Sequence, residues 1–132
     1  MSRRFLLDTH CWLWWNADPE RLGDGAHRVI SDMENEVFLS AASAWEIAIK
    51  HALGRLTLPE PPAKYIPSRI AANQISGLAI HFHHALKVND LPHHHRDPFD
   101  RLLIAQAKVE GMTLITADPL IKRYDVDVLM AG

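Results

Sequence analysis

The sequence has little cysteine, no excess of positive charge and no long apolar run. Its single cysteine, Cys11, excludes an intrachain disulfide, and nothing in the sequence indicates an oxidising compartment. The formal net charge of −2 disfavours a module that coats DNA or RNA with a basic surface. It remains compatible with an enzyme that meets phosphate groups through bound cations.

The apolar segments are too short to span a bilayer, so we expect no membrane association. Arg3 and Arg4 followed by apolar residues 5–7 are similar to the start of a signal peptide, but Asp8 and His10 interrupt the apolar run too early. We therefore expect a cytoplasmic protein. Repeats and low-complexity tracts are absent, and 132 residues predict a single domain over residues 1–132 with one core.

Short apolar segments of strand character alternate with segments of helical periodicity along the chain. The predicted strands cover residues 4–8, 36–40, 78–80, 112–116 and 126–129. The predicted helices follow residue 8, cover about 23–35, follow residue 40, lie beyond the proline-rich segment 58–67, cover 84–89, follow residue 97, and cover 119–124. This alternation predicts an α/β fold in three α/β/α layers, with a mainly parallel sheet of about four to five strands.

One predicted helix start carries an acid with two possible roles. Asp97 is a good N-cap residue, and Pro98 fits the first helical position, where its missing N–H costs nothing. Asp100 then falls in the first turn, where the helix dipole favours a carboxylate. Asp100 therefore either supports the helix end or takes part in chemistry.

Three further acids lie at or within strongly apolar segments, where a charge is usually avoided. Asp8 and Asp118 follow predicted strands, so parallel pairing brings them to one edge of the sheet, where ligands bind in open sheets. Glu46 lies inside an apolar helix, where an unpaired buried carboxylate is costly. The alternative for Glu46 is a surface ion pair with Lys50 one turn later, worth about 0.2–0.5 kcal/mol.

Four acids gathered at one edge would repel one another unless a cation lies among them. Carboxylates are hard oxygen ligands that suit Mg²⁺ or Mn²⁺, and two such ions can activate a water and stabilise the leaving oxygen of a phosphodiester. The hydroxyls of Thr9, Ser43 and Thr116 lie near these acids in the sequence and are candidates to orient a carboxylate or a metal-bound water. Their alternative role is backbone bonding at turns and caps.

Four blocks of the sequence, in order, resemble the PIN-domain family, and most closely its VapC-type toxins of bacterial toxin–antitoxin pairs. The blocks are residues 6–10, 43–47, 97–107 and 114–118, and the resemblance covers essentially the whole chain. It implies a compact α/β/α domain and a Mg²⁺- or Mn²⁺-dependent endoribonuclease. It further implies a homodimer held inactive by a cognate antitoxin, whose C-terminal segment lies over the active site.

The resemblance also implies which residues form the site. Asp8, Glu46, Asp100 and Asp118 match the four acids of the family in order. Asp8 and Asp100 are expected as the principal metal ligands, with Glu46 and Asp118 completing the catalytic site. Asp97 is assigned to the helix cap. Arg101, which follows Asp100, either contacts a phosphate or an acid or is solvated on the helix surface.

Alternative functions remain open at the level of sequence. Three consecutive histidines, 93–95, cannot all face one zinc ion from regular structure, so a solvated loop or an RNA contact is favoured for them and for His81, His83 and His84. A non-catalytic RNA- or protein-binding module of the same fold is a second alternative. A DNA nuclease or a phosphatase with the same two-ion chemistry is a third, because pocket details decide how the 2′-hydroxyl is read. The tryptophans at 12, 14 and 15 are predicted to lie in the core or at an interface.

Overall fold

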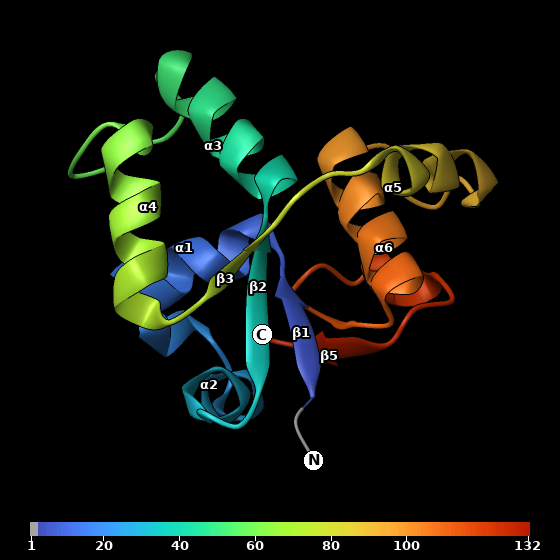
Figure 1. Cartoon of the computed structure of the whole chain (residues 1–132), viewed down its shortest axis with the longest axis horizontal. Helices are drawn as coiled ribbons and strands as arrows, with labels where there is room; N and C mark the ends of the chain where they lie inside the picture. Colours follow the sequence, from blue (N-terminus) through green and yellow to red (C-terminus); the bar gives the residue numbers. More distant parts are fainter. Residues whose placement is uncertain (1–2) are drawn as a thin grey trace.

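The computed structural model of the protein describes residues 3–132 and contains a five-stranded sheet in the order β3-β2-β1-β4-β5 (Figure 1). The strands are β1 (Arg4–Leu7), β2 (Glu36–Ser40), β3 (Ser76–Leu78), β4 (Thr113–Thr116) and β5 (Val128–Met130). All four strand pairs are parallel. The prediction of a parallel α/β sheet is thus confirmed, with β5 at the sheet edge.

Helices connect the strands and cover both faces of the sheet. They are α1 (Thr9–Ala17), α2 (Asp24–Ser31), α3 (Ala41–Ala52), α4 (Pro62–Asn73), α5 (Phe82–Lys87) and α6 (Pro98–Glu110), with short 3₁₀ turns at Pro19–Arg21, Val88–Asp90 and Ile121–Arg123. Figure 1 shows α1, α2 and α4 on one side of the sheet and α5 and α6 on the other. This arrangement gives the predicted three layers.

Alternation along the central strand divides the apolar core in two, because successive strand residues face opposite sides of a sheet. Phe5 and Leu7 pack with the α1, α2 and α4 side. Leu6 packs with Leu103 and other residues of the α6 side. The central strand β1 is therefore buried on both faces, and the residue that follows it is held in a fixed position.

The proline-rich segment differs from its prediction. The sequence favours a helix only beyond Pro67, yet α4 begins at Pro62 and includes Pro67. Pro62 occupies the first helical turn, where a missing N–H leaves no intrahelical bond unmade, so the proline starts the helix instead of delaying it. The chain then turns at Gln74, whose φ of 58° is left-handed, and β3 begins two residues earlier than predicted.

The tryptophan cluster is only partly in the core. Trp12 is fully buried and packs edge-on against Tyr65, with 6.0 Å between ring centroids. Trp14 and Trp15 are half-buried, and the guanidinium of Arg21 lies over the Trp14 ring. The core position is confirmed for Trp12. Within residues 3–132, every helix is too short or too polar to cross a membrane.

Candidate active site

Two neighbouring strands bring their following residues to one edge of the sheet. Asp8 comes directly after β1, and its N–H donates to the Ile115 carbonyl on β4 (2.9 Å). Asp118 comes two residues after Thr116, the last residue of β4. The predicted juxtaposition of Asp8 with the end of β4 is therefore present, because β1 and β4 are hydrogen-bonded partners.

The Asp8 carboxylate is buried and held by two donors. Oδ1 accepts the Cys11 N–H (2.8 Å), which caps α1, and Oδ2 accepts the Thr116 hydroxyl (2.5 Å). Each carboxylate oxygen has further lone-pair capacity, so Asp8 can cap the helix and still bind a cation.

Burial, followed by the charge of Asp8, raises the pKa of the Cys11 thiol, so Cys11 is not a nucleophile here.

The other two candidate hydroxyls bond to each other. Thr9 Oγ1 donates to Ser43 Oγ (2.9 Å), and both residues are buried. This bond joins the first turns of α1 and α3, the helices that carry Asp8 at the N-cap and Glu46. Their contribution to the site is to fix how these two helices meet, and any contact with a metal-bound water stays a prediction.

Glu46 is buried on α3, with its side chain only 3% exposed. Its Oε2 accepts from Lys50 Nζ (2.6 Å), so the ion pair considered from the sequence is present. Its Oε1 is buried without a hydrogen-bond partner among the described residues. An unsatisfied buried carboxylate oxygen is costly. The ion pair with Lys50 therefore satisfies only one of the two carboxylate oxygens, and the other is suited to bind a cation.

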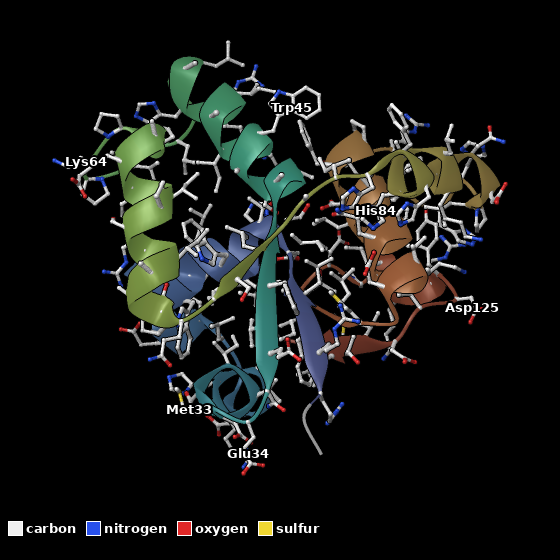
Figure 2. All side chains as sticks on the ribbon, in the orientation of Figure 1. Met33, Glu34, Trp45, Lys64, His84 and Asp125 are labelled. Carbon is white, nitrogen blue, oxygen red and sulfur yellow. The ribbon has the colours of Figure 1, made fainter. Side chains whose placement is uncertain are left out.

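At the start of α6 the two acids have separate tasks. Asp97 Oδ1 accepts the N–H groups of Phe99 (2.8 Å) and Asp100 (3.2 Å), as expected of the N-cap. Asp100 is thereby free of any capping role. The Phe99 ring packs edge-on against Trp45 of α3, with 5.2 Å between centroids (Figure 2 labels Trp45). Since Phe99 precedes Asp100 and Trp45 precedes Glu46, this contact brings the two acids' helices together.

The pKa of Asp100 indicates that Asp8, Glu46 and Asp97 lie near it. Burial raises the pKa of Asp100 to about 7, and the charges of Asp97, Asp8 and Glu46 act in the same direction, whereas His95 lowers it. A carboxyl group half-protonated at neutral pH, among three other acids, is typical of a functional site. A divalent cation would remove the conflict that raises this pKa.

His95 lies beside these acids, whereas the sequence favours a solvated loop or an RNA contact for it; the structure replaces the solvated loop, and the RNA contact stays a prediction. Its Nε2 lies 2.7 Å from Asp118 Oδ2 and 3.1 Å from Asp100 Oδ2. Its Nδ1 accepts the Asp97 N–H (3.0 Å), so the ring proton is on Nε2. The sequence offers one signal for this role: His95 lies two residues before Asp97, the N-cap of the helix whose first turn carries Asp100.

Arg101 corrects a second expectation. It is buried, and its guanidinium donates to the carbonyls of Pro92 (2.8 Å), Val88 (3.1 Å) and Leu91 (3.4 Å) and to the Tyr124 hydroxyl (3.3 Å). Its donors are therefore directed at the segment before α6, and neither a phosphate contact nor a solvated surface position describes it. Arg101 fixes the entry of the chain into the helix that carries Asp100.

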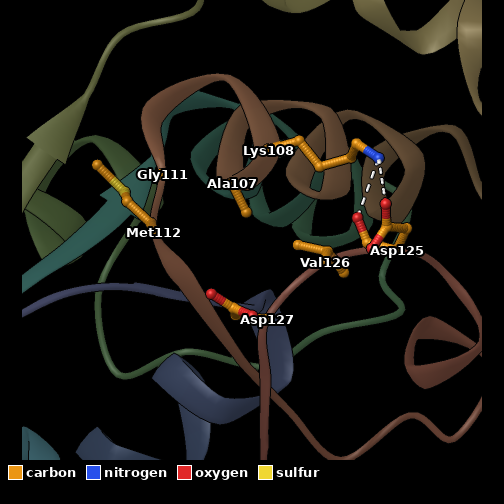
Figure 3. Close-up of a pocket in the computed structure, with 7 residues that line it drawn as sticks. All are labelled: Ala107, Lys108, Gly111, Met112, Asp125, Val126 and Asp127. Carbon is orange, nitrogen blue, oxygen red and sulfur yellow. Dashed lines mark hydrogen bonds and ion pairs between the residues drawn. The ribbon is translucent and has the colours of Figure 1, made fainter.

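Two other features lie at the opposite end of α6 from Asp100. His84 (Figure 2) is fully buried, with Nε2 2.7 Å from Glu110 Oε2, and its Nδ1 accepts the His81 N–H (3.0 Å). Because Nε2 carries the proton, His84 acts as a donor to Glu110 and not as a zinc ligand. The cavity in Figure 3 is bordered by the Lys108–Asp125 contact. Neither feature is part of the acidic site.

The cap assignment gives a testable prediction. Asp97→Ala removes the acceptor of two N–H groups and is expected to lower the free energy of unfolding by about 1 kcal/mol. Asp97→Asn keeps an acceptor oxygen at the same place and is expected to lose much less. Urea denaturation of both variants checks this, and equal losses would show that the charge of Asp97, not its cap bond, matters.

The domain is thus an all-parallel sheet between two layers of helices, with acidic side chains gathered beyond the carboxyl ends of its strands. The PIN domain family model matches residues 5–127, so the chain belongs to the PIN domain family, in its VapC group. This confirms the resemblance seen in the four sequence blocks.

Two relatives and one solved structure illustrate the similarity. The chain is 30% identical over 120 residues to Ribonuclease VapC22 of Mycobacterium tuberculosis, covering 90% of each protein. It is 46% identical to Ribonuclease VapC16 of the same organism over 56 residues, which spans 42% of this chain and only 40% of that protein. A chain in the crystal structure of VapBC2 from Rickettsia felis, bound to a DNA fragment from their promoter, superposes with a TM-score of 0.73. That match covers 98% of this chain and 99% of that one, and at 13% identity it shows the fold alone.

Proposed function

We propose that the protein is a Mg²⁺- or Mn²⁺-dependent endoribonuclease that hydrolyses RNA phosphodiester bonds as the toxin of a toxin–antitoxin pair. The observation that carries the proposal is the buried Oε1 of Glu46, which lacks a partner among the described residues. It lies close enough to Asp100 to raise the pKa of that carboxyl group. Oxygen ligands of this kind suit Mg²⁺ and Mn²⁺.

Asp8 and Asp100 are the principal ligands in this proposal, and Glu46 and Asp118 complete the catalytic set. When bound, the divalent ions supply an activated water and neutralise charge on the phosphodiester. The chain's own contribution is orientation. The Cys11 N–H and the Thr116 hydroxyl fix both oxygens of Asp8, so its free lone pairs have a defined direction.

The partners follow from the relatives and from one exposed face. VapC22 and VapC16 are named ribonucleases, which supports RNA as the substrate. The solved neighbour is a VapBC assembly, which supports a cognate antitoxin as partner. The placement of the antitoxin's C-terminal segment over the active site is part of the same proposal and rests on the family resemblance. Three apolar side chains spaced one turn apart, Trp45 and Ile49 on α3 and Leu53 at its C-cap, are 59%, 37% and 61% exposed, which supports a homodimer on this face. A cytoplasmic location is part of the same proposal.

The test is cleavage of a mixed RNA pool with Mg²⁺, with Mn²⁺ and with chelator. Asp8→Asn keeps the acceptor for the Cys11 N–H and is expected to fold, yet to lose at least about 100-fold in cleavage rate, because a charged ligand is removed. Glu34→Gln is the matched control, since Glu34 is exposed on the turn before β2, away from the acids (Figure 2).

Three outcomes would contradict the proposal. Turnover retained in folded Asp8→Asn would exclude Asp8 from the chemistry. Cleavage of single-stranded DNA but not RNA would favour the DNA nuclease. A wild-type protein that neither binds Mn²⁺ nor cleaves RNA would favour the non-catalytic binding module.

A further inference from the structure

We propose that His95 is a hydrogen-bond donor that closes the metal-free site: its Nε2–H bridges Asp100 and Asp118, and a divalent cation must displace this donor to bind them. The inference rests on the proposed function and assigns a role to a residue outside the four acids. Its basis is the pair of contacts from one ring nitrogen to carboxylates on two different elements, 3.1 Å to Asp100 and 2.7 Å to Asp118.

The His95 ring is fixed in one tautomer and one orientation. The Asp97 N–H donates to Nδ1 (3.0 Å), and the backbone N–H of His95 itself donates to the Tyr124 hydroxyl (2.8 Å). Tyr124 is buried, and the His95 side chain is only 12% exposed. With Nδ1 occupied as an acceptor, the neutral ring has its proton on Nε2, directed at the two carboxylates.

This tautomer excludes His95 as a metal ligand of the site. Ligation through Nε2 requires its lone pair, which places the ring proton on Nδ1. Nδ1 would then face the Asp97 N–H donor, and two donors would oppose each other at hydrogen-bond distance. His95 is therefore a donor that competes with a cation for carboxylate oxygens.

His95 and a cation compete for the same two carboxylates, Asp100 and Asp118. One ring nitrogen of His95 and one carboxylate oxygen each of Asp100 and Asp118 all lie within 4.8 Å of one another. Asp100 and Asp118 would together hold a Mg²⁺ ion, and a cation held by both would need the carboxylate lone pairs that now accept from Nε2–H. Binding therefore exchanges a shared hydrogen bond for metal–oxygen bonds.

The backbone of each acid is placed without His95. Asp100 lies in the first turn of α6, and Asp118 Oδ1 accepts the Leu120 N–H (2.9 Å). Removal of His95 therefore leaves the backbone of both acids in place and makes the surroundings of their carboxylates more negative. The metal-free protein becomes less stable, and its affinity for a divalent cation rises.

The experiment is isothermal titration of Mn²⁺ into the full chain at pH 8, with thermal melts of the metal-free protein. His95→Ala is expected to bind Mn²⁺ about 5- to 10-fold more tightly than wild type, an effect of the size of one intramolecular hydrogen bond, and to melt at a lower temperature. His95→Gln places an amide N–H near the position of Nε2 and is expected to restore both values toward wild type. His93→Ala, an exposed neighbour, is the control.

A merely structural role for His95 gives a different pattern. It predicts a lower melting temperature with Mn²⁺ affinity unchanged or weakened, and that result in folded His95→Ala would overturn the inference. The same holds if His95→Gln behaves like His95→Ala. Absence of Mn²⁺ binding in wild type and in His95→Ala together would overturn the proposed metal-dependent function itself, which distinguishes the two failures.

Discussion

Asp100→Asn is expected to lose at least about 100-fold in RNA cleavage and, at pH 8, to be more stable than wild type. The gain in stability follows from the raised pKa of Asp100, about 7 against an ordinary value of 3.8. A raised pKa means that the folded state disfavours the charged carboxylate. The resulting destabilisation is small at pH 4, grows between about pH 4 and 7, and is constant above that range.

Neutral asparagine removes this destabilisation, which is at most about 4 kcal/mol for a shift of this size. Urea denaturation at pH 4.5 and pH 8 measures it, and the advantage of Asp100→Asn at pH 4.5 should be only about a quarter of its value at pH 8. Asp127→Asn, whose side chain is exposed, is the control with the same chemical change. A variant less stable than wild type at pH 8 would return Asp100 to the role of a helix-end acid, which the dipole favours.

The Mn²⁺ affinity of the wild-type protein is expected to fall about 10-fold for each pH unit below about 7, and to be nearly constant above it. The reason is that Asp100 must release its proton before it can bind a cation, and its pKa in the metal-free protein is about 7. Between pH 7, where half of Asp100 is deprotonated, and pH 5 the affinity should therefore drop by about 50-fold.

Titration calorimetry in two buffers of different ionisation enthalpy measures this directly. At pH 6 the buffers should report the release of close to one proton per bound ion, and at pH 8.5 close to none. An affinity that stays constant between pH 6 and pH 8 would mean that Asp100 is not a ligand, even if the protein binds Mn²⁺.

The parts of the site that depend on local signals could be predicted from the sequence. The Asp97 cap, the helix that begins at Pro98 and the placement of Asp8 at the end of a buried strand all follow from residues within a few positions of one another. The parallel order of strands then brings Asp118 toward Asp8, because parallel strands end at the same edge.

The remaining features depend on partners distant in sequence. His95 is placed in the site by two contacts, from its backbone N–H to the Tyr124 hydroxyl and from its ring to Asp118. Asp118 lies 23 residues away in the sequence, and no periodicity near residue 95 indicates either contact. Arg101 lies beside an acid in the sequence, yet its partners are the carbonyls of the segment 88–92. The partnerless oxygen of Glu46 is likewise a property of packing and has no sequence signature.

The bond between Thr116 and Asp8 joins residues 108 positions apart, because β4 lies beside β1 in the middle of the sheet. During synthesis β1 leaves the ribosome long before its partner β4 has been made. Until β4 has emerged, Asp8 lacks the hydroxyl that orients it, and Asp118 has not been made. A nascent or truncated chain that lacks β4 therefore has no assembled acidic site.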